Sequence, residues 1–160
     1  MWEKAGLLLL LIAANGAPIL LAWALDPRWD WPLDGGRMHA DGRPLLGGHV
    51  TTRGLVGAVL ATMVLAYLLG LGAGLGALIG LLAMVGDALS SFVKRRLGLK
   101  PGDKATGLDQ IPESLLPLIA VAGSFGFGWL DLGLLVAAFT LFDMAVSGPL
   151  YRLHLRQRPY

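Results

Sequence analysis

Four polar residues recur at helical spacing inside an otherwise apolar stretch, and their types are those of a site that holds a metal ion beside a phosphate. They are Asp87, Ser91, Lys94 and Arg95. At 3.6 residues per turn these positions share one helix face, which leads from the apolar stretch to its basic end. Arg96 lies about 100° round the helix from this face and is expected to contribute less to phosphate binding than Lys94 and Arg95. The basic run alone is typical of an anchor to acidic lipids, but an anchor needs no carboxylate two turns further in.

A second acidic pair follows this stretch. Asp109 and Glu113 lie one turn apart, and Pro112 between them is a residue typical of the first turn of a helix. The two carboxylates can stabilise the positive end of that helix, or they can supply oxygen ligands to a hard cation such as Mg²⁺. Spacing alone leaves both interpretations open.

The segment between residues 26 and 53 is long and rich in Gly, Asp and Arg. A glycine-rich backbone with nearby arginines, Arg53 among them, can bind phosphate, although solvated turns are the commoner explanation. His49 has no Cys, His or Glu at metal-ligand spacing, which argues against a zinc site. The sequence contains no Walker loop, dinucleotide fingerprint or nucleophile–His–acid set.

Two further polar residues lie in apolar stretches, where such a group needs a protein, water or ligand partner. Asn15 stands beside Gly16 and Pro18, so it either forms a hydrogen bond at a helix kink or contributes to a ligand site. Asp143 lies about two turns from the end of its stretch. A structural contact with a basic side chain is favoured there over a functional role.

The composition indicates that membrane helices position these residues. Of 160 residues, 55% are hydrophobic, 23 are glycine and only 15% are charged, with a mean hydropathy of +0.64. A soluble domain carries about 25% charged residues, so the composition argues against a soluble globular chain and excludes a disordered one. The absence of cysteine excludes disulfides and thiolate chemistry.

Five apolar stretches are predicted to cross the membrane, which makes residues 1–160 a single all-α integral membrane domain. Residues 54–93 would form one helix about 60 Å long, twice the thickness of the apolar bilayer core, so they must fold back at the glycine-rich residues 70–74. The first stretch is longer than the apolar part of a signal peptide, which favours a span. The predicted spans are approximately residues 5–25, 54–69, 75–93, 114–130 and 132–151.

The positive charges indicate how these spans are oriented. Every one of the 13 Lys and Arg residues except Lys4 falls after the first, third or fifth span. The positive-inside rule therefore predicts that the long loop after the first helix, the basic loop after the third and the C-terminus are cytoplasmic, with the N-terminus outside. Tryptophans fall at both predicted boundaries, as in an aromatic belt. They are Trp2 and Trp129 outside, and Trp23, Trp29 and Trp31 inside.

Short motifs follow one another along the chain from Asn15 to about Glu113. They are Asn-Gly-Ala-Pro at 15–18, Pro-Leu-Asp-Gly-Gly-Arg at 32–37, Asp-Gly-Arg at 41–43, Leu-Gly at 46–47, Thr51 with Arg53-Gly54, Gly-Asp at 86–87, Ser-Phe-Val-Lys-Arg-Arg-Leu-Gly at 91–98 and Leu-Asp-Gln at 108–110. This series resembles the CDP-archaeol synthase family, integral-membrane relatives of phosphatidate cytidylyltransferase, and the family's five-span layout agrees with the topology predicted above. The chain departs from the family's usual Lys and Trp at Val50 and Thr52.

The resemblance implies a cytidylyltransferase that transfers CMP from CTP to an unsaturated archaeal ether-lipid phosphate, giving CDP-archaeol and pyrophosphate. It implies Mg²⁺ held by Asp87 and Asp109, and catalysis by these carboxylates together with Lys94. Glu113 is the nearest acid to the position where the family has a further Asp, and it is taken as a third metal ligand. The implied substrate contacts are Asn15, Arg53, Ser91, Lys94 and Arg95.

The expected partners are therefore CTP, the lipid phosphate and the surrounding membrane lipids, with no nucleic acid, and the expected location is the cell membrane. A homo-oligomer is compatible with this interpretation. The competing class is a lipid-binding or small-solute transporting membrane protein without catalysis, in which the buried acids form an ion path. Against it, the polar residues gather on the cytoplasmic side and no inverted repeat is visible.

Overall fold

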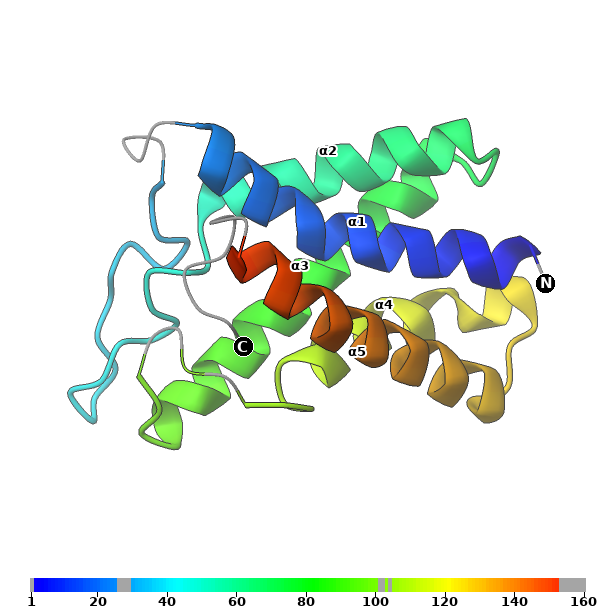
Figure 1. The fold of residues 1–160 in the computed structure, drawn as a ribbon. Helices are drawn as coiled ribbons and strands as arrows, with labels where there is room; N and C mark the ends of the chain where they lie inside the picture. Colours follow the sequence, from blue (N-terminus) through cyan, green and yellow to red (C-terminus); the bar gives the residue numbers. More distant parts are fainter. Residues whose placement is uncertain (1, 26–29, 101–102, 104, 153–160) are drawn as a thin grey trace.

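Five helices run back and forth along a common direction in the computed structural model (Figure 1). The structure describes residues 2–25, 30–100, 103 and 105–152, without the side chains of residues 150–152. The helices in these residues are α1 (Trp2–Ala24), α2 (Thr52–Leu68), α3 (Ala73–Arg96), α4 (Gln110–Phe125) and α5 (Trp129–Arg152). The fold class is therefore all-α, as the sequence predicts.

The length and composition of the helices identify a membrane protein. Among the described residues, α1, α3 and the segment Trp129–Pro149 of α5 are each long and apolar enough to cross a membrane. The other two helices are shorter: α2 is apolar and has 17 residues, and α4 has 16. The exact boundaries of five spans stay a prediction.

The two ends of the bundle differ (Figure 1). Short turns at residues 69–72 and 126–128 close one end, where α1 also begins, and we call it the hairpin end. The long connections from α1 to α2 and from α3 to α4 lie at the other, which we call the loop end. Some residues used in the orientation argument lie outside the described part of the chain. They are Arg28, Trp29, Lys104, Arg156, Arg158 and the side chain of Arg152.

The apolar core lies toward the hairpin end. Every helix contributes to it from the half nearest that end, so the chain buries its largest side chains there. The buried members are Leu7, Leu10, Leu11, Ala66, Ile79, Leu118, Val121, Leu132, Leu135 and Phe139. The loop-end half of the bundle is left for the polar residues.

Two glycines bring α3 into direct contact with its neighbours. A Cβ at Gly80 would lie 2.3 Å from Oγ1 of Thr62, so only glycine allows α2 to pack this closely. A Cβ at Gly86 would lie 2.4 Å from the carbonyl oxygen of Pro112 and 2.5 Å from Cα of Glu113. The backbone of α3 therefore touches the first turn of α4 one residue before Asp87.

The boundary between α4 and α5 differs from the predicted one. Gly126, with φ of 64°, ends α4 in a left-handed cap, so the turn comes before Trp129 and not at Asp131. Asp131 instead lies in the first turn of α5, where it accepts a hydrogen bond from the N–H of Gly128 at 3.2 Å. It also binds Nζ of Lys4 at 2.5 Å. This acid therefore caps α5 and fastens α1 to it at the hairpin end.

Candidate functional site

Asp87, Lys94 and Asp109 come together where α3 meets the start of α4, which we call the α3–α4 junction. Nζ of Lys94 lies 2.6 Å from Oδ1 of Asp109, whose Oδ2 accepts a hydrogen bond from the N–H of Ala105 at 3.0 Å. The Asp87 carboxylate is close enough to interact with the charges of both Lys94 and Asp109. In the described part of the chain, no hydrogen bond or ion pair is formed by the Asp87 side chain. The junction therefore joins residues that are far apart in sequence and leaves one carboxylate available.

This junction is compatible with a bound Mg²⁺ but is not a preformed cage. Among the described residues, no group of three or more His, Asp or Glu side chains is placed to hold a metal ion. Mg²⁺ is commonly bound by only one or two protein carboxylates together with substrate phosphates and water. The available carboxylate of Asp87 and its neighbour Asp109 fit that pattern. Glu113, 9% exposed in the first turn of α4, completes no three-carboxylate group, so its role as a ligand stays a prediction.

Arg95 is a buried cation beside the junction. The residue is 3% exposed, and its charge interacts with those of Asp103 and Asp109. Within the described residues, its Nε and Nη1 have no hydrogen-bond partner. Buried donors of this kind are costly unless an acceptor reaches them, and guanidinium groups match phosphate oxygens well. Ser91, one turn earlier on the same helix, is also buried.

Two of the predicted substrate contacts lie in other surroundings. Asn15 donates from Nδ2 to the carbonyl oxygen of Leu11 at 3.0 Å, a bond within α1. Nη2 of Arg53 lies 3.2 Å from Oδ1 of Asp30, in the first turn of α2 at the loop end. The structure thus brings Asp87, Lys94 and Asp109 together, and the substrate roles of Asn15 and Arg53 stay predictions.

The connection from α1 to α2 is an ordered turn structure in its described part. Isolated β-bridges pair Pro32 with Thr51 and Met38 with Pro44. Asp34 accepts hydrogen bonds at its two carboxylate oxygens from the N–H groups of Gly36, at 2.9 Å, and Leu46, at 2.8 Å. Asp34 therefore stabilises the fold of this segment.

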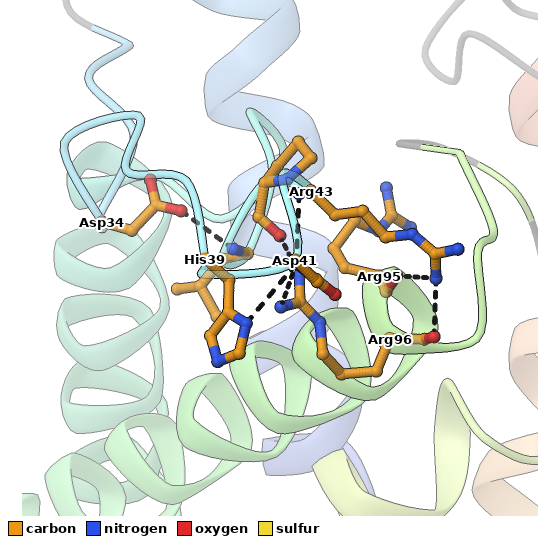
Figure 2. A network of polar contacts seen from close by, with 8 residues as sticks. Asp34, His39, Asp41, Arg43, Arg95 and Arg96 are labelled. Atoms are coloured by element: carbon orange, nitrogen blue, oxygen red, sulfur yellow. Dashed lines mark hydrogen bonds and ion pairs between the residues drawn. The ribbon is translucent and has the colours of Figure 1, made fainter.

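Arg43 and Arg96 fasten this connection to the end of α3 (Figure 2). Arg43 donates to the carbonyl oxygens of Arg95 and Arg96, and Arg96 donates to Oδ1 of Asp41 at 3.0 Å and the carbonyl oxygen of Pro44 at 2.6 Å. We call this set the loop clasp. The rotation of a residue round a helix does not reveal which loop covers it, so these contacts of Arg96 were not predicted. That Arg96 contributes less to phosphate binding than Lys94 and Arg95 stays a prediction.

The pKa of the Asp41 carboxyl lies below its ordinary value. Partial loss of solvent raises it, but the hydrogen bond from the N–H of Arg43 and the charges of Arg96, His39 and Arg43 outweigh that effect. A group with a lowered pKa stabilises the fold above its unfolded-state pKa and loses that contribution as the pH falls through the folded-state value. Asp41 is therefore ionised at neutral pH, where it attracts Arg96.

Known proteins share this arrangement of sequence and fold. The family model for CDP-archaeol synthase, CarS-like, matches residues 72–160. The chain is also 33% identical over 166 residues to the CDP-archaeol synthase of Aeropyrum pernix, a match that covers 99% of this chain and 91% of that protein. This chain belongs to the CDP-archaeol synthase family.

Other comparisons agree. The CDP-archaeol synthase of Methanopyrus kandleri is 41% identical, over 81% of this chain and 79% of that protein. The CDP-archaeol synthase of Hyperthermus butylicus is 44% identical over 62% of this chain, and that match spans 60% of its length. A solved structure of an intramembrane enzyme for archaeal membrane lipid biosynthesis has a TM-score of 0.75 and 33% identity, covering 90% of this chain and 92% of that one.

In this member of the CDP-archaeol synthase family, Gln110 links the junction to α5. Its Oε1 accepts a hydrogen bond from the N–H of Gly107 at 2.9 Å, and its Nε2 donates to Oδ2 of Asp143 at 2.8 Å. Gln110 is 2% exposed and follows Asp109 directly, so it holds the turn that presents that carboxylate. The contact of Asp143 with the amide of Gln110 is a structural one, the kind of role that the sequence favours for this residue. The sequence pointed to a role for Gln110 only through its place in the Leu-Asp-Gln motif at 108–110.

Two departures from the family's usual residues have structural roles here. Val50 is fully buried, and its carbonyl oxygen accepts a hydrogen bond from the N–H of Leu33 at 2.8 Å. Oγ1 of Thr52 donates to the carbonyl oxygen of Trp31 at 3.4 Å. Together they close the base of the connection between α1 and α2.

Proposed function

We propose that the chain is a cytidylyltransferase that transfers CMP from CTP to a membrane lipid phosphate of the archaeal ether-lipid type. The products are the CDP-lipid and pyrophosphate. The proposal rests on the meeting of Asp87, Lys94, Arg95 and Asp109 at the loop end of a membrane helix bundle. Membership of the CDP-archaeol synthase family supports it.

The reaction needs two anions to be held against their mutual repulsion. A phosphate oxygen of the lipid attacks the α-phosphorus of CTP, a new P–O bond forms, and the bond from the α-phosphorus to the bridging oxygen breaks. Pyrophosphate leaves with the electron pair of that bond. Lys94 and Arg95 bind the phosphate oxygens and offset their negative charge, so the main contributions of the protein are positioning and electrostatic stabilisation.

Asp87 and Asp109 would hold Mg²⁺ in this scheme. The ion would add positive charge beside the triphosphate and so favour departure of pyrophosphate. Lys94 pairs with Asp109 and is thereby held in place for a phosphate. The 3%-exposed Arg95 offers donors that face no competition from water.

The position of the site also fits the two substrates. CTP is soluble in water, whereas the chains of the lipid must stay in the bilayer, so a site at the end of the helices serves both. We propose that this loop end faces the cytoplasm, which agrees with the distribution of Lys and Arg.

A direct assay tests this function. Purified protein in detergent or lipid vesicles is supplied with CTP, Mg²⁺ and an unsaturated ether-lipid phosphate, and CDP-lipid and pyrophosphate are measured together. We expect equimolar formation of both, dependent on CTP and on the lipid. The variant Asp87→Asn is the inactive control, and Lys100→Ala, an exposed change at the same end of the bundle, is the active one. Absence of CDP-lipid with every lipid phosphate tested, while CTP is bound or transported, would overturn the proposal.

A further inference from the structure

The loop clasp completes the C-terminus of α3, the turn that carries Lys94 and Arg95. The last carbonyl groups of a helix lack partners within the helix. Nη1 of Arg43 donates to two of them, the carbonyl oxygens of Arg95 at 3.3 Å and Arg96 at 2.7 Å. Its guanidinium also lies against Gly98, where a Cβ would be 3.5 Å away. A cation at this end of a helix is additionally favoured by the helix dipole.

The contact is reciprocal, because α3 binds the loop in return (Figure 2). Nη1 and Nη2 of Arg96 donate to Asp41 and to the carbonyl oxygen of Pro44, and the guanidinium lies over the ring of Phe92, 5.1 Å from its centroid. The ring of His39 meets the same phenyl ring edge-on, with 6.0 Å between centroids. Each segment thus supplies an arginine to the backbone of the other.

The turn that makes these contacts is itself well determined. The N–H of His39 donates to the carbonyl oxygen of Arg43 at 2.8 Å, and the N–H of Gly42 donates to that of His39 at 3.0 Å. Oδ1 of Asp41 accepts from the N–H of Arg43 at 3.1 Å. A turn fixed by its own hydrogen bonds can hold another element in place.

The contacts of the arginines indicate which of them hold the loop and which can bind an anion. Arg43 and Arg96 direct terminal nitrogens at carbonyl and carboxylate oxygens of the protein. Arg95 lies between these contacts in sequence, yet in the described part of the chain its Nε and Nη1 have no such acceptor. Nε of Arg96 has no hydrogen-bond partner in these residues either, but both of its terminal nitrogens are used by the loop. The clasp therefore occupies the terminal nitrogens of Arg96 and leaves Nη1 of Arg95 for an external anion.

We propose that Arg43 and Arg96 are positioning residues, which fix the last turn of α3 through the 39–44 turn so that Lys94 and Arg95 bind the phosphates of CTP. This inference rests on the proposed function for its substrate. It assigns to Asp41 a role opposite to the one that simple electrostatics predicts. An acid near a phosphate site should weaken binding of CTP, whereas an acid that holds the clasp together should strengthen it.

The test compares Arg43→Gln, Arg96→Gln and Asp41→Ala with the wild-type enzyme in detergent, with Lys100→Ala as the matched loss of one charge at the same end. We expect each of the first three changes to raise KM for CTP, by about tenfold for either arginine, which corresponds to 1.4 kcal/mol. KM for the lipid phosphate should stay within twofold. Hydrogen exchange of the amides of residues 97–99 should become at least fivefold faster, because these N–H groups bond to the last turn of α3.

The direction in which Asp41→Ala changes KM for CTP decides between the two roles of Asp41. A lower KM for CTP in this variant, or unchanged exchange at residues 97–99 in Arg43→Gln, would overturn the inference and favour Arg43 and Arg96 as direct phosphate contacts. Faster exchange with an unchanged KM for CTP would also overturn it, since the clasp would then be structural only. A wild-type enzyme and Lys100→Ala variant that both lack CTP-dependent turnover would instead overturn the proposed function, while the exchange measurement still reports on the clasp.

Discussion

At the scale of single residues, Lys94 and Arg95 differ in the protein groups that they contact. Lys94 is paired with Asp109, whereas Arg95 is buried with Nε and Nη1 unbonded in the described part of the chain. An anionic substrate can therefore bind Arg95 without displacing a protein acceptor from those two nitrogens. At Lys94 it must share the ammonium group with a carboxylate.

Removing either cation should weaken the use of CTP. Lys94→Ala and Arg95→Ala each delete a charge-assisted phosphate contact of about 1.5–3 kcal/mol, so we expect KM for CTP to rise roughly ten- to hundredfold. Lys100→Ala should leave it within twofold. Steady-state kinetics on equal amounts of membrane-inserted protein provide the measurement. If the two variants insert poorly but the inserted fraction keeps its KM, the basic run is a lipid anchor.

Asp87→Asn and Asp109→Asn should both nearly abolish turnover, because an amide is a poor ligand for a hard cation. They should differ in stability. Asp109→Asn breaks the 2.6 Å contact with Lys94 and should cost roughly 1–3 kcal/mol, whereas in the described residues Asp87 has no such contact to lose. Glu113→Gln should reduce turnover less. Turnover is titrated against Mg²⁺, and thermal unfolding is followed in detergent; an Asp87→Asn variant with full Mg²⁺-dependent activity would exclude the metal role.

At the scale of the helices, the close approach of α3 and α4 sets the distance between the two carboxylates. Helical periodicity predicts that Asp87, Ser91, Lys94 and Arg95 share a face, and glycine content predicts the turn between α2 and α3. Periodicity cannot predict that Asp109 meets this face, because that depends on the path of the loop between them. The predicted fourth span begins at residue 114, whereas α4 itself begins at Gln110, because its first turn is polar and lies outside the apolar run. Pro112 lies in that first turn, as its residue type predicts.

Gly86→Ala should push these two helices apart. The added Cβ would lie within 2.5 Å of backbone atoms of Pro112 and Glu113, and backbone cannot rotate away as a side chain can. We expect a loss of about 1–3 kcal/mol in stability and a fall in turnover of at least tenfold. Gly74→Ala, in the same helix with no atom within 4 Å of the added Cβ, should be neutral or stabilising. Equal thermal midpoints and turnover in the two variants would show that the helix contact does not position the site.

At the scale of the whole molecule, the chain divides into an apolar half that holds the helices together and a polar half that carries the candidate site. The hydrophobic core comes from the hairpin-end half of every helix, while the junction and the loop clasp lie at the loop end. Composition predicts a membrane bundle because it shows that the chain has too few charged residues to cover its surface in water. It cannot predict the loop clasp, whose side chains contact backbone groups more than 50 positions away in sequence.

The orientation of this bundle in the membrane can be measured directly because the chain has no cysteine. Single cysteines are introduced at exposed or open positions of the two ends: Gly128→Cys at the hairpin end, and Gly48→Cys and Lys100→Cys at the loop end. The positive-inside rule predicts that a membrane-impermeant maleimide labels Gly128→Cys on intact cells and labels the other two only after permeabilisation. The same labelling after permeabilisation shows that each site is reactive. Labelling of Lys100→Cys on intact cells would place the site outside, away from cytoplasmic CTP. Labelling of both ends from one side would contradict an odd number of membrane crossings.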